Sequence, residues 1–236
     1  MIYIGTSGYF YKNWVGEFYP ADIKTHEFFN YYAKHFNSLE LNSTFYRFPK
    51  ITTIKSWKYK LKYFENFKIS IKANRNITHK SRLKDLDELK DFLSVIKNLD
   101  IYLGAVLFQL PPSLKYDIRL LINFTRALDD DLKYAIEFRN SSWYRLETYT
   151  HLKDKNIAVV WHDYNQEINF TQTADFIYVR LHGTQGKYKG NYSDEFLLEL
   201  KNRIKDNESY VYFNNTDDNS ACKDALRLKA VFENKI

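Results

Sequence analysis

Strand-like and helix-like segments alternate along this chain of 236 residues, and the alternation limits the folds open to it. Runs rich in β-branched and aromatic residues predict strands at residues 2–4, 38–45, 67–73, 104–110, 133–143, 157–161, 176–183 and 209–213. Between them, apolar residues recur at helical spacing, as Phe29, Tyr32 and Phe36 do after the first strand. Strands separated by helices form parallel sheets with right-handed crossovers, so the pattern predicts an α/β fold.

The number of strand–helix units selects one α/β architecture. Eight units in 236 residues match a (β/α)8 TIM barrel, whose usual size is about 250 residues. The competing topology is a doubly wound open sheet, whose first turn carries a G-x-G-x-x-G pattern. Gly5-Thr-Ser-Gly8 does not fit that pattern, and the chain has no obvious linker. We therefore predict a single TIM-barrel domain over residues 1–236.

Polar side chains lie where the predicted strands end. In the fifth strand Ala135, Glu137 and Arg139 share one face, because a strand alternates its side chains between two faces. A carboxylate and a guanidinium are costly on a buried face unless they are paired, which indicates a cleft rather than a plain core. On other strands, too, polar side chains near the strand end share one face. TIM barrels place their active sites at the carboxyl ends of the strands.

These polar strand ends define one predicted site. As catalytic residues we select Glu40, Glu137 and His182, because carboxylates and imidazoles transfer protons near neutrality. The predicted substrate-binding residues are polar or aromatic and lie at or just after strand ends: Asn42, Lys72, His79, Gln109, Arg139, Trp143, Asp163, Arg180, Asn214 and Asn215. Plainer interpretations exist for single members: Glu137 with Arg139 is about as often a structural ion pair. No metal ligand is assigned, since no H-E-x-x-H or clustered cysteine spacing occurs.

Charge and composition restrict the partners without identifying one. A net charge of +6 and a pI near 9.0 permit an anionic partner, nucleic acid included, although the lysines are scattered. No run of about 18 apolar residues exists, so no membrane partner is expected. The first residues lack the design of a signal peptide, and the single cysteine, Cys222, fits a reducing compartment. We therefore expect a cytoplasmic protein.

Several motifs together resemble one known family. They are Gly5-Thr-Ser-Gly8 with Trp14-Val-Gly16 and Phe18-Tyr-Pro20, Glu40-Leu-Asn-Ser-Thr-Phe-Tyr-Arg47, Thr78-His79, Leu107-Phe-Gln-Leu-Pro-Pro112, Glu137-Phe-Arg139 with Ser142-Trp143, Val179-Arg-Leu-His-Gly183 and Phe213-Asn-Asn215. Through them nearly the whole chain resembles the domain of unknown function 72 (YecE-like) family, whose members look like TIM barrels. The resemblance implies this fold and transfers no reaction.

Two positions depart from the pattern of that family. Relatives commonly have a proline-containing loop after strand six, whereas His162-Asp-Tyr-Asn165 has none, which predicts that helix six is short or missing. Near the end of the chain, Asp224 stands where an asparagine is usual. The first departure affects the sixth side of the predicted pocket.

The first functional hypothesis is an enzyme, a hydrolase or lyase that acts on a phosphorylated or otherwise anionic substrate. Lys72, Arg139 and Arg180 would hold the anion, the arginines through their bidentate forks. One of the two glutamates would act as general base and His182 as acid. Because three cations in one pocket disfavour a strongly attracted metal ion, we predict no cofactor.

Three alternatives stay open. A metal-assisted enzyme would use Glu40, Glu137, Asp163 and His182 as ligands for a divalent ion. A nuclease or other nucleic-acid-binding protein would combine the basic charge with stacking on aromatic loops, and it requires lysines that form a stripe toward the site. A non-catalytic module would use the same pocket to bind a ligand or partner. None of these hypotheses fixes the oligomeric state.

Overall fold

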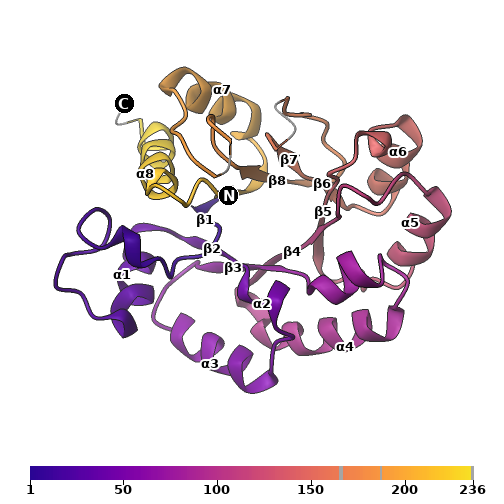
Figure 1. Ribbon diagram of the computed structural model, residues 1–236, viewed down its shortest axis with the longest axis horizontal. Helices are drawn as coiled ribbons and strands as arrows, with labels where there is room; N and C mark the ends of the chain where they lie inside the picture. The colour runs from indigo at the N-terminus through magenta and orange to yellow at the C-terminus, as the bar shows by residue number, and fades with distance from the viewer. Residues whose placement is uncertain (165–166, 187, 235–236) are drawn as a thin grey trace.

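The strands of the chain form two parallel sheets with helices around them. The computed structural model describes residues 1–164, 167–186 and 188–234. One sheet has the strand order β1-β9-β8-β7 and the other the order β2-β3-β4-β5-β6. Figure 1 shows the strands on the inside of the molecule and the helices on its periphery. The predicted α/β fold with parallel strands is confirmed at this level.

Every strand-like run of the sequence contains a strand. The four-stranded sheet holds β1 (Ile2–Thr6), β9 (Glu208–Phe213), β8 (Phe176–Leu181) and β7 (Trp161–His162). The five-stranded sheet holds β2 (Ser38–Leu41), β3 (Lys68–Lys72), β4 (Leu103–Gln109), β5 (Lys133–Glu137) and β6 (Ala158–Val159). The sixth predicted strand is the exception to a simple match, because it is divided between the two sheets as β6 and β7.

Helices follow most of the strands. They are α1 (Phe28–His35), α2 (Ser43–Tyr46), α3 (Ile51–Leu61), α4 (Leu86–Ile96), α5 (Ile118–Thr125), α6 (Leu146–Asp154), α7 (Asp194–Ile204) and α8 (Ser220–Phe232). Ser193 caps α7 by accepting the N–H of Phe196, as its place before two acidic residues predicts. Between β7 and β8 no helix occurs in residues 163–164 and 167–175, in line with a short or missing helix six. Among the described helices, none combines the length and apolar character that a bilayer span requires.

Two apolar clusters separate the inner from the outer face of the strands. On β5, Tyr134 and Ile136 belong to the outer cluster, which packs under the helices, whereas Ala135 belongs to the inner one. The inner cluster consists of Tyr3, Ala105, Leu107, Ala135, Ala158, Val160, Phe176, Tyr178, Tyr210 and Tyr212. Because these residues come from both sheets, the inner faces of the sheets pack on one another. The parity predicted for Glu137 therefore directs its side chain inward.

The two sheets are joined differently at their two junctions. Between β6 and β7 only Val160 intervenes, and its N–H donates to the carbonyl of Ile136 at 3.0 Å. Between β1 and β2 the only ladder contact in the described chain is an isolated parallel bridge of Ser7 with Glu40. The N–H of Gly8 supports this bridge by donating to the carbonyl of Glu40 at 2.8 Å.

Close packing holds β1 against β2 where their ladder is short. The hydroxyl of Tyr32, on α1, accepts from the N–H of Thr6 at 2.8 Å and donates to the carbonyl of Ser38 at 2.9 Å. Gly5 faces the same carbonyl, and a Cβ at this position would lie 2.0 Å from its oxygen. A larger residue would therefore push the two strands apart.

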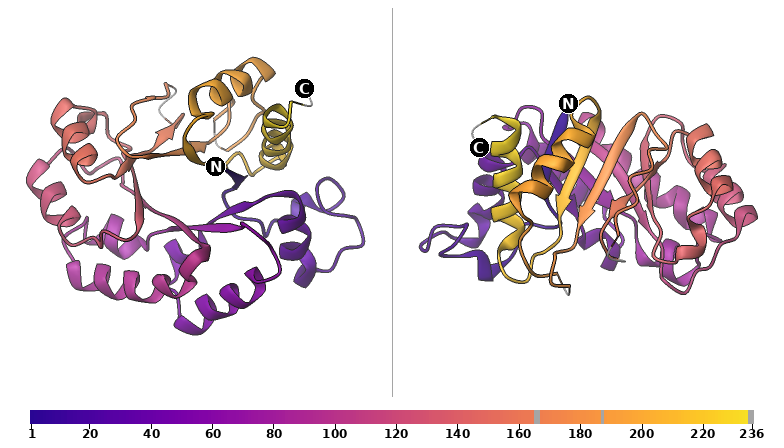
Figure 2. Two further views of the ribbon diagram at one scale, coloured as in Figure 1. Left: turned by 180° about the vertical axis from the view of Figure 1, so that it is seen from behind. Right: turned by 90° about the horizontal axis from the view of Figure 1, so that it is seen from above.

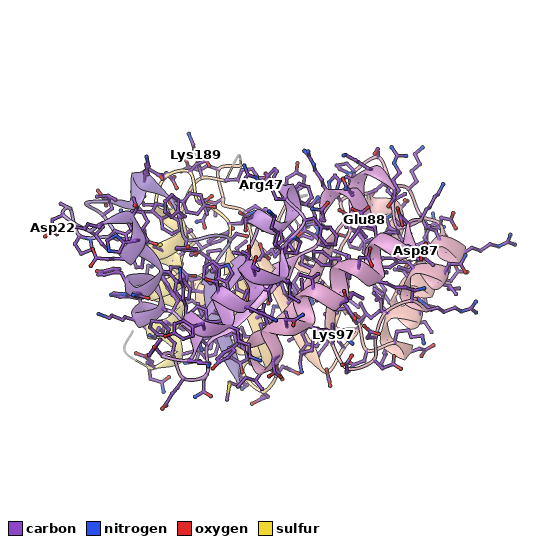
Figure 3. The ribbon with its side chains drawn as sticks, turned by 90° about the horizontal axis from the view of Figure 1, so that it is seen from below. Asp22, Arg47, Asp87, Glu88, Lys97 and Lys189 are labelled. Atoms are coloured by element: carbon purple, nitrogen blue, oxygen red, sulfur yellow. The ribbon has the colours of Figure 1, made fainter. Side chains whose placement is uncertain are left out.

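Because all strands are parallel, their carboxyl ends gather at one side of the molecule, as the edge-on view of Figure 2 shows. Figure 3 locates this side: Arg47, which follows β2, and Lys189, which follows β8, lie toward one edge, and Lys97, which precedes β4, lies toward the opposite edge. The polar strand ends predicted from the sequence thus face the edge of Arg47 and Lys189.

Candidate functional site

Arg180 lies at the centre of the polar side chains at the carboxyl ends of the strands, and it is 1% exposed. Its Nε donates to Oε2 of Glu40 at 2.9 Å, and its Nη1 donates to Oε2 of Glu137 at 2.6 Å. Its Nη2 donates to Oε1 of Glu40 at 2.9 Å and to Oγ of Ser7 at 3.2 Å. All three nitrogens are therefore occupied by protein acceptors, so the contacts of Arg180 do not favour the predicted binding of a substrate anion, which stays a prediction.

Arg139 is the second buried arginine of the cluster, and it forms a third ion pair. Its Nε contacts Oε1 of Glu137, and its guanidinium lies 3.5 Å from the ring centroid of Tyr164. Burial raises the pKa of Glu137, but the guanidinium groups of Arg139 and Arg180 outweigh burial and hold this pKa well below its usual value. Glu137 therefore stays ionised and fully bonded at neutral pH. Its geometry does not suit the predicted role of general base, which needs a pKa near the working pH.

The imidazole of His182 is held in one tautomer by its neighbours. Its Nε2 lies 2.9 Å from Nη2 of Arg139, and because a guanidinium only donates, Nε2 must accept. Its Nδ1 then carries the proton and donates to Oδ1 of Asp163 at 3.0 Å. Burial lowers the pKa of His182 to about 4 despite this carboxylate. In this arrangement His182 has no proton on Nε2 to donate at neutral pH, so its contacts do not favour the predicted role as an acid, which stays a prediction.

Asp163 fixes His182 and is itself fixed. Its Oδ1 also accepts the backbone N–H of His182 at 2.7 Å, and its Oδ2 accepts from the hydroxyl of Tyr192. Burial raises the pKa of Asp163, but the hydrogen bonds from His182 and Tyr192 outweigh burial and lower it. Asp163 therefore acts here as an anchor for the imidazole, and its predicted contact with substrate stays a prediction.

Lys72 forms a second, less buried part of the site. Its Nζ donates to Oε1 of Gln109 at 2.7 Å and lies 4.3 Å from the ring centroid of Phe45. No carboxylate of the described residues lies within ion-pair distance of this nitrogen. Burial, and after it the charge of Arg180, lower the pKa of Lys72 to about 7. His79 is close by, with its ring 5.0 Å from that of Phe45.

The remaining predicted residues lie in three different settings. Asn42 is half-buried and donates to Oγ of Ser7 at 3.3 Å, and its Oδ1 is buried without a hydrogen-bond partner among the described residues. Asn214 is half-buried at the end of β9. Asn215 is fully buried and donates to the carbonyl of Gly190 and to Asp224, so it holds a loop rather than a substrate.

Trp143 does not belong to the site. It is fully buried and stacks on Phe138 with ring centroids 4.8 Å apart. Its indole N–H donates to the carbonyl of Leu114 at 2.8 Å. Because no part of this ring is accessible, the predicted substrate contact is corrected: Trp143 packs in the outer core.

Four residues of the site were not selected from the sequence. Ser7 contacts both Glu40 and Arg180, and Tyr178 donates to Oε2 of Glu40 at 2.7 Å. Tyr178 had a usable signal, since it shares strand parity with Arg180 and His182, whereas Ser7 follows β1, on which no residue was selected. Tyr164 and Tyr192 lie in loops, where no periodicity marks the direction of a side chain. Their contacts with Arg139 and Asp163 could not be read from spacing.

The donor sets available for a metal ion are limited. Within the described ranges, no three His, Cys, Asp or Glu side chains are grouped so that they could hold a metal ion. In the set proposed for a metal-assisted enzyme, Glu40 and Glu137 accept from Arg180, and Asp163 accepts from His182. These carboxylate oxygens are directed at protein donors.

A cavity of about 1010 Å³ adjoins the cluster beside the segment between β7 and β8, whose described residues form no helix. Its lining includes Asp163, Tyr164, Ile168, Phe170, Tyr192 and Phe196. The cavity lies along β7, β8 and α7, whereas Lys72 lies on β3 in the other sheet. The open space is therefore beside Asp163 and away from Lys72.

Comparisons with known proteins agree with this fold. The family model described as "Protein of unknown function DUF72" matches residues 3–236. The chain is 28% identical over 146 residues to the UPF0759 protein YecE of Escherichia coli (strain K12), a match that covers 61% of this chain and 50% of YecE. It is 28% identical over 153 residues to the UPF0759 protein YunF of Bacillus subtilis (strain 168), covering 61% and 52%. The matches therefore span about half the length of each relative.

Two solved structures are similar over almost their whole length. A DUF72 family protein of Thermotoga maritima superposes with a TM-score of 0.82 at 28% identity and covers 99% of each chain. A DUF72 family protein of Enterococcus faecalis superposes with a TM-score of 0.83 at 19% identity and covers 99% of this chain and 96% of that one. The second likeness shows a shared fold.

Replacement of Arg180 should be far more costly than replacement of an exposed arginine. Arg180→Met leaves two buried carboxylates without their shared cation, and breaking a buried pair in this way costs about 3–5 kcal/mol. Arg203→Met, the control, removes an exposed pair with Glu199 and should cost less than about 1 kcal/mol. Urea denaturation measures both free energies of unfolding. Equal losses in the two variants would contradict the central role of Arg180.

Stability should depend on pH through His182. An unfolded histidine has a pKa of about 6.5, whereas burial sets the pKa of folded His182 at about 4. Below pH 6.5 the unfolded chain binds a proton that the folded chain refuses, so the stability present above pH 6.5 is lost as the pH falls toward 4. Between pH 7.5 and pH 5 the loss should be about 2 kcal/mol.

The variant His182→Gln isolates this effect. Glutamine keeps an acceptor for Arg139 but does not titrate, so its free energy of unfolding should lack this part of the pH dependence. Urea denaturation at pH 7.5, 6 and 5 gives the difference between wild type and variant. A difference that does not change with pH would show that His182 is not held neutral.

Proposed function

This chain belongs to the DUF72 family, and from its site we propose that it is an enzyme, a hydrolase or lyase, that acts on a phosphorylated or otherwise anionic substrate. The proposed site lies at the carboxyl ends of the strands. The observation that carries the proposal is Lys72, a half-buried amine that faces Gln109 and has no carboxylate partner in the described chain.

As the scaffold of this site we propose a single domain in which the two sheets close into one (β/α)8 barrel. Three observations support closure. The bridge of Ser7 with Glu40 connects β1 to β2, only Val160 separates β6 from β7, and the inner apolar cluster draws on both sheets. Arg180 adds a fourth, since it binds carboxylates of the other sheet across the interior.

Lys72 is the group best suited to proton transfer in this site. With its pKa lowered by burial to about 7, the amine is present in both protonation states at neutral pH. A group with a pKa near the working pH is an efficient general acid or base. Glu137 lacks this property because two guanidinium groups hold its pKa low. We therefore assign the acid–base role to Lys72 in place of the carboxylates.

Arg139 is the proposed anion-binding group. Its Nε and Nη2 bind Glu137 and His182, while its Nη1 makes no hydrogen bond within the described residues. Burial, and after it the charges of Lys72 and Arg139, lower the pKa of His79, and the rings of His79 and Phe45 lie 5.0 Å apart beside Lys72. An anionic substrate between Lys72 and Arg139 would be oriented by Gln109 and His79. No cofactor is needed in this scheme, and a cytoplasmic location is part of the proposal.

The anion site can be tested by thermal stability. The panel holds inorganic phosphate, ribose 5-phosphate, glycerol 3-phosphate and neutral ribose. A ligand at about 100 times its dissociation constant stabilises by about 2.7 kcal/mol, which raises the melting temperature of a chain of this size by about 5–10 °C. The shift should be lost in Lys72→Met and kept in Lys90→Met, whose lysine is exposed on α4.

The outcomes separate the functional classes. Stabilisation by a phosphorylated compound that Lys90→Met keeps and Lys72→Met loses would support the proposal. An equal rise in melting temperature with neutral ribose would contradict the proposal that the substrate is anionic. Stabilisation by no member of the panel would favour the non-catalytic module that binds a protein partner.

A specific surface feature favours nucleic acid binding as a second candidate function. The loops that follow β2, β3, β4 and β5, residues 42–50, 73–85, 110–117 and 138–145, are strongly basic. Their exposed basic residues are Arg47, Lys50, Arg75, Lys80, Arg82, Lys84, Lys115 and Arg145, against the acids Asp85 and Asp117. Tyr46 is 66% exposed among them. Proteins that bind single-stranded nucleic acid without sequence preference neutralise its phosphates with basic side chains and stack its bases on exposed aromatic rings.

Binding of a fluorescent single-stranded oligonucleotide tests this candidate. Affinity measured by anisotropy should fall steeply between 50 and 200 mM salt, because each neutralised phosphate releases counterions. Tyr46→Ala should weaken binding about tenfold, the size of one lost stacking contact. The control is Tyr63→Ala, since Tyr63 is 72% exposed but lies before β3, away from the basic loops. An equal effect of both variants, or no binding at 50 mM salt, would count against nucleic acid.

A further inference from the structure

We propose that Lys72 is a nucleophile that forms an imine with the carbonyl carbon of the substrate, so that the reaction is a lyase reaction on an anionic aldehyde or ketone. The inference rests on the proposed enzymatic site and selects one of its two reaction classes. It also gives Lys72 a covalent role beyond proton transfer.

The position of Lys72 is fixed by the strand that carries it. It is the last residue of β3, it pairs in register with Leu107 of β4, and its carbonyl accepts from Oγ1 of Thr44 at 2.7 Å. Its side chain is half-buried, and its Nζ lies over the ring of Phe45. A nucleophile needs such a fixed direction together with access for the substrate.

The contacts of the Lys72 amine differ from those of the lysines that form ion pairs in the described chain. Lys58, Lys97 and Lys133 bind carboxylates, which stabilise the ammonium form. The Nζ of Lys72 instead faces the neutral amide oxygen of Gln109. An amide oxygen accepts from a neutral amine as well as from an ammonium, and so it leaves the nitrogen lone pair available.

The charges that face Lys72 lie on or after β8, β5 and β2, and they act on its pKa in opposite directions. Arg180 on β8 and Arg139 after β5 disfavour its ammonium form, whereas Glu137 on β5 and Glu40 on β2 favour it. Burial decides the balance and lowers the pKa to about 7. About half of Lys72 is then neutral at pH 7, compared with well below 0.1% of an ordinary lysine of pKa about 10.4.

The covalent steps balance without another reagent. The lone pair of Nζ adds to the carbonyl carbon, and the two hydrogens of the amine leave with the carbonyl oxygen as water. The resulting imine takes one proton from solvent, and as an iminium it accepts the electron pair of the carbon–carbon bond that breaks between the adjacent carbon and a hydroxyl-bearing carbon. That hydroxyl loses its proton to solvent, and the departing fragment leaves as an aldehyde. The enamine that remains takes a proton on carbon, and water hydrolyses the iminium so formed, which releases the second carbonyl product and restores Lys72. Arg139 would hold the anionic group of the substrate during these steps.

Reductive trapping tests the proposal on the whole chain. Dihydroxyacetone phosphate and neutral dihydroxyacetone are each incubated with the protein and sodium cyanoborohydride, and modified peptides are mapped by mass spectrometry. We expect one dominant adduct, at Lys72, whose rate of formation is half-maximal near pH 7, where the pKa lowered by burial places its titration. Exposed lysines should react substantially only at a much higher pH.

Two variants and the mapping itself keep the test decisive. Lys72→Arg keeps a positive charge but has no nucleophilic amine, so its adduct should disappear, and Lys90→Arg should label as wild type does. Adducts spread evenly over exposed lysines of the wild type would overturn the proposal even if Lys72→Arg failed to fold. A dominant adduct that still forms in a folded Lys72→Arg variant would also overturn the proposal.

The two substrates separate this inference from the proposed function. Preferential trapping of dihydroxyacetone phosphate at Lys72 supports both the imine and the anionic substrate. Equal trapping of neutral dihydroxyacetone supports the imine and contradicts the proposal that the substrate is anionic. Stabilisation by anions without any trapping overturns the imine and leaves Lys72 as an acid–base group.

Discussion

The ion pairs between the guanidinium of Arg180 and two buried glutamates are the interaction on which the rest of the structure depends. Taking a charge out of water is costly unless geometry and hydrogen bonds compensate for it, and here each nitrogen of Arg180 meets a fixed acceptor. The acceptors come from β2, from β5 and from the residue after β1, while Arg180 comes from β8. The cation is satisfied only when both sheets stand in their native relation. With Arg139 added, two positive and two negative charges balance inside the molecule, so the cluster fixes geometry without leaving a net charge.

This balance decides which groups remain available for chemistry. A carboxylate that two guanidinium groups stabilise is a poor base, and an imidazole that accepts from one of them is a poor acid. A glutamate and a histidine often form a catalytic pair. Here the contacts of Glu137 and His182 instead hold the arginines in place. The amine of Lys72 lies at the edge of the same charge cluster, where burial lowers its pKa and no carboxylate among the described residues binds it. The proposed reactivity thus lies where pairing is incomplete.

The sequence was sufficient for the location of this cluster but not for its internal bonding. Strand parity placed Glu40, Glu137 and Arg180 on inward faces because a two-residue period is a property of the backbone alone. Which acceptor each guanidinium finds depends on strand order and register, so neither the tautomer of His182 nor the full occupation of Arg180 could be derived. Trp143 was assigned to the site because it follows a polar strand end, yet the turn at Ser141–Trp143 directs its ring into the outer core. The division of the sixth strand at Val160 likewise has no signal in an apolar run.

The pairing of β1 with β9 has a consequence for the order in which the chain can fold during its synthesis. The five strands of the larger sheet lie between residues 38 and 159 and are neighbours in sequence as well as in space, so they can associate while the remainder is still being made. Strand β1 must instead wait for β9, residues 208–213, which is made after the five-stranded sheet. Until Arg180 has been added, Glu40 lacks its cation and Glu137 has only Arg139, so burying these carboxylates against the second sheet is costly. The same two carboxylates that later bind the sheets together thus disfavour closure of the unfinished chain.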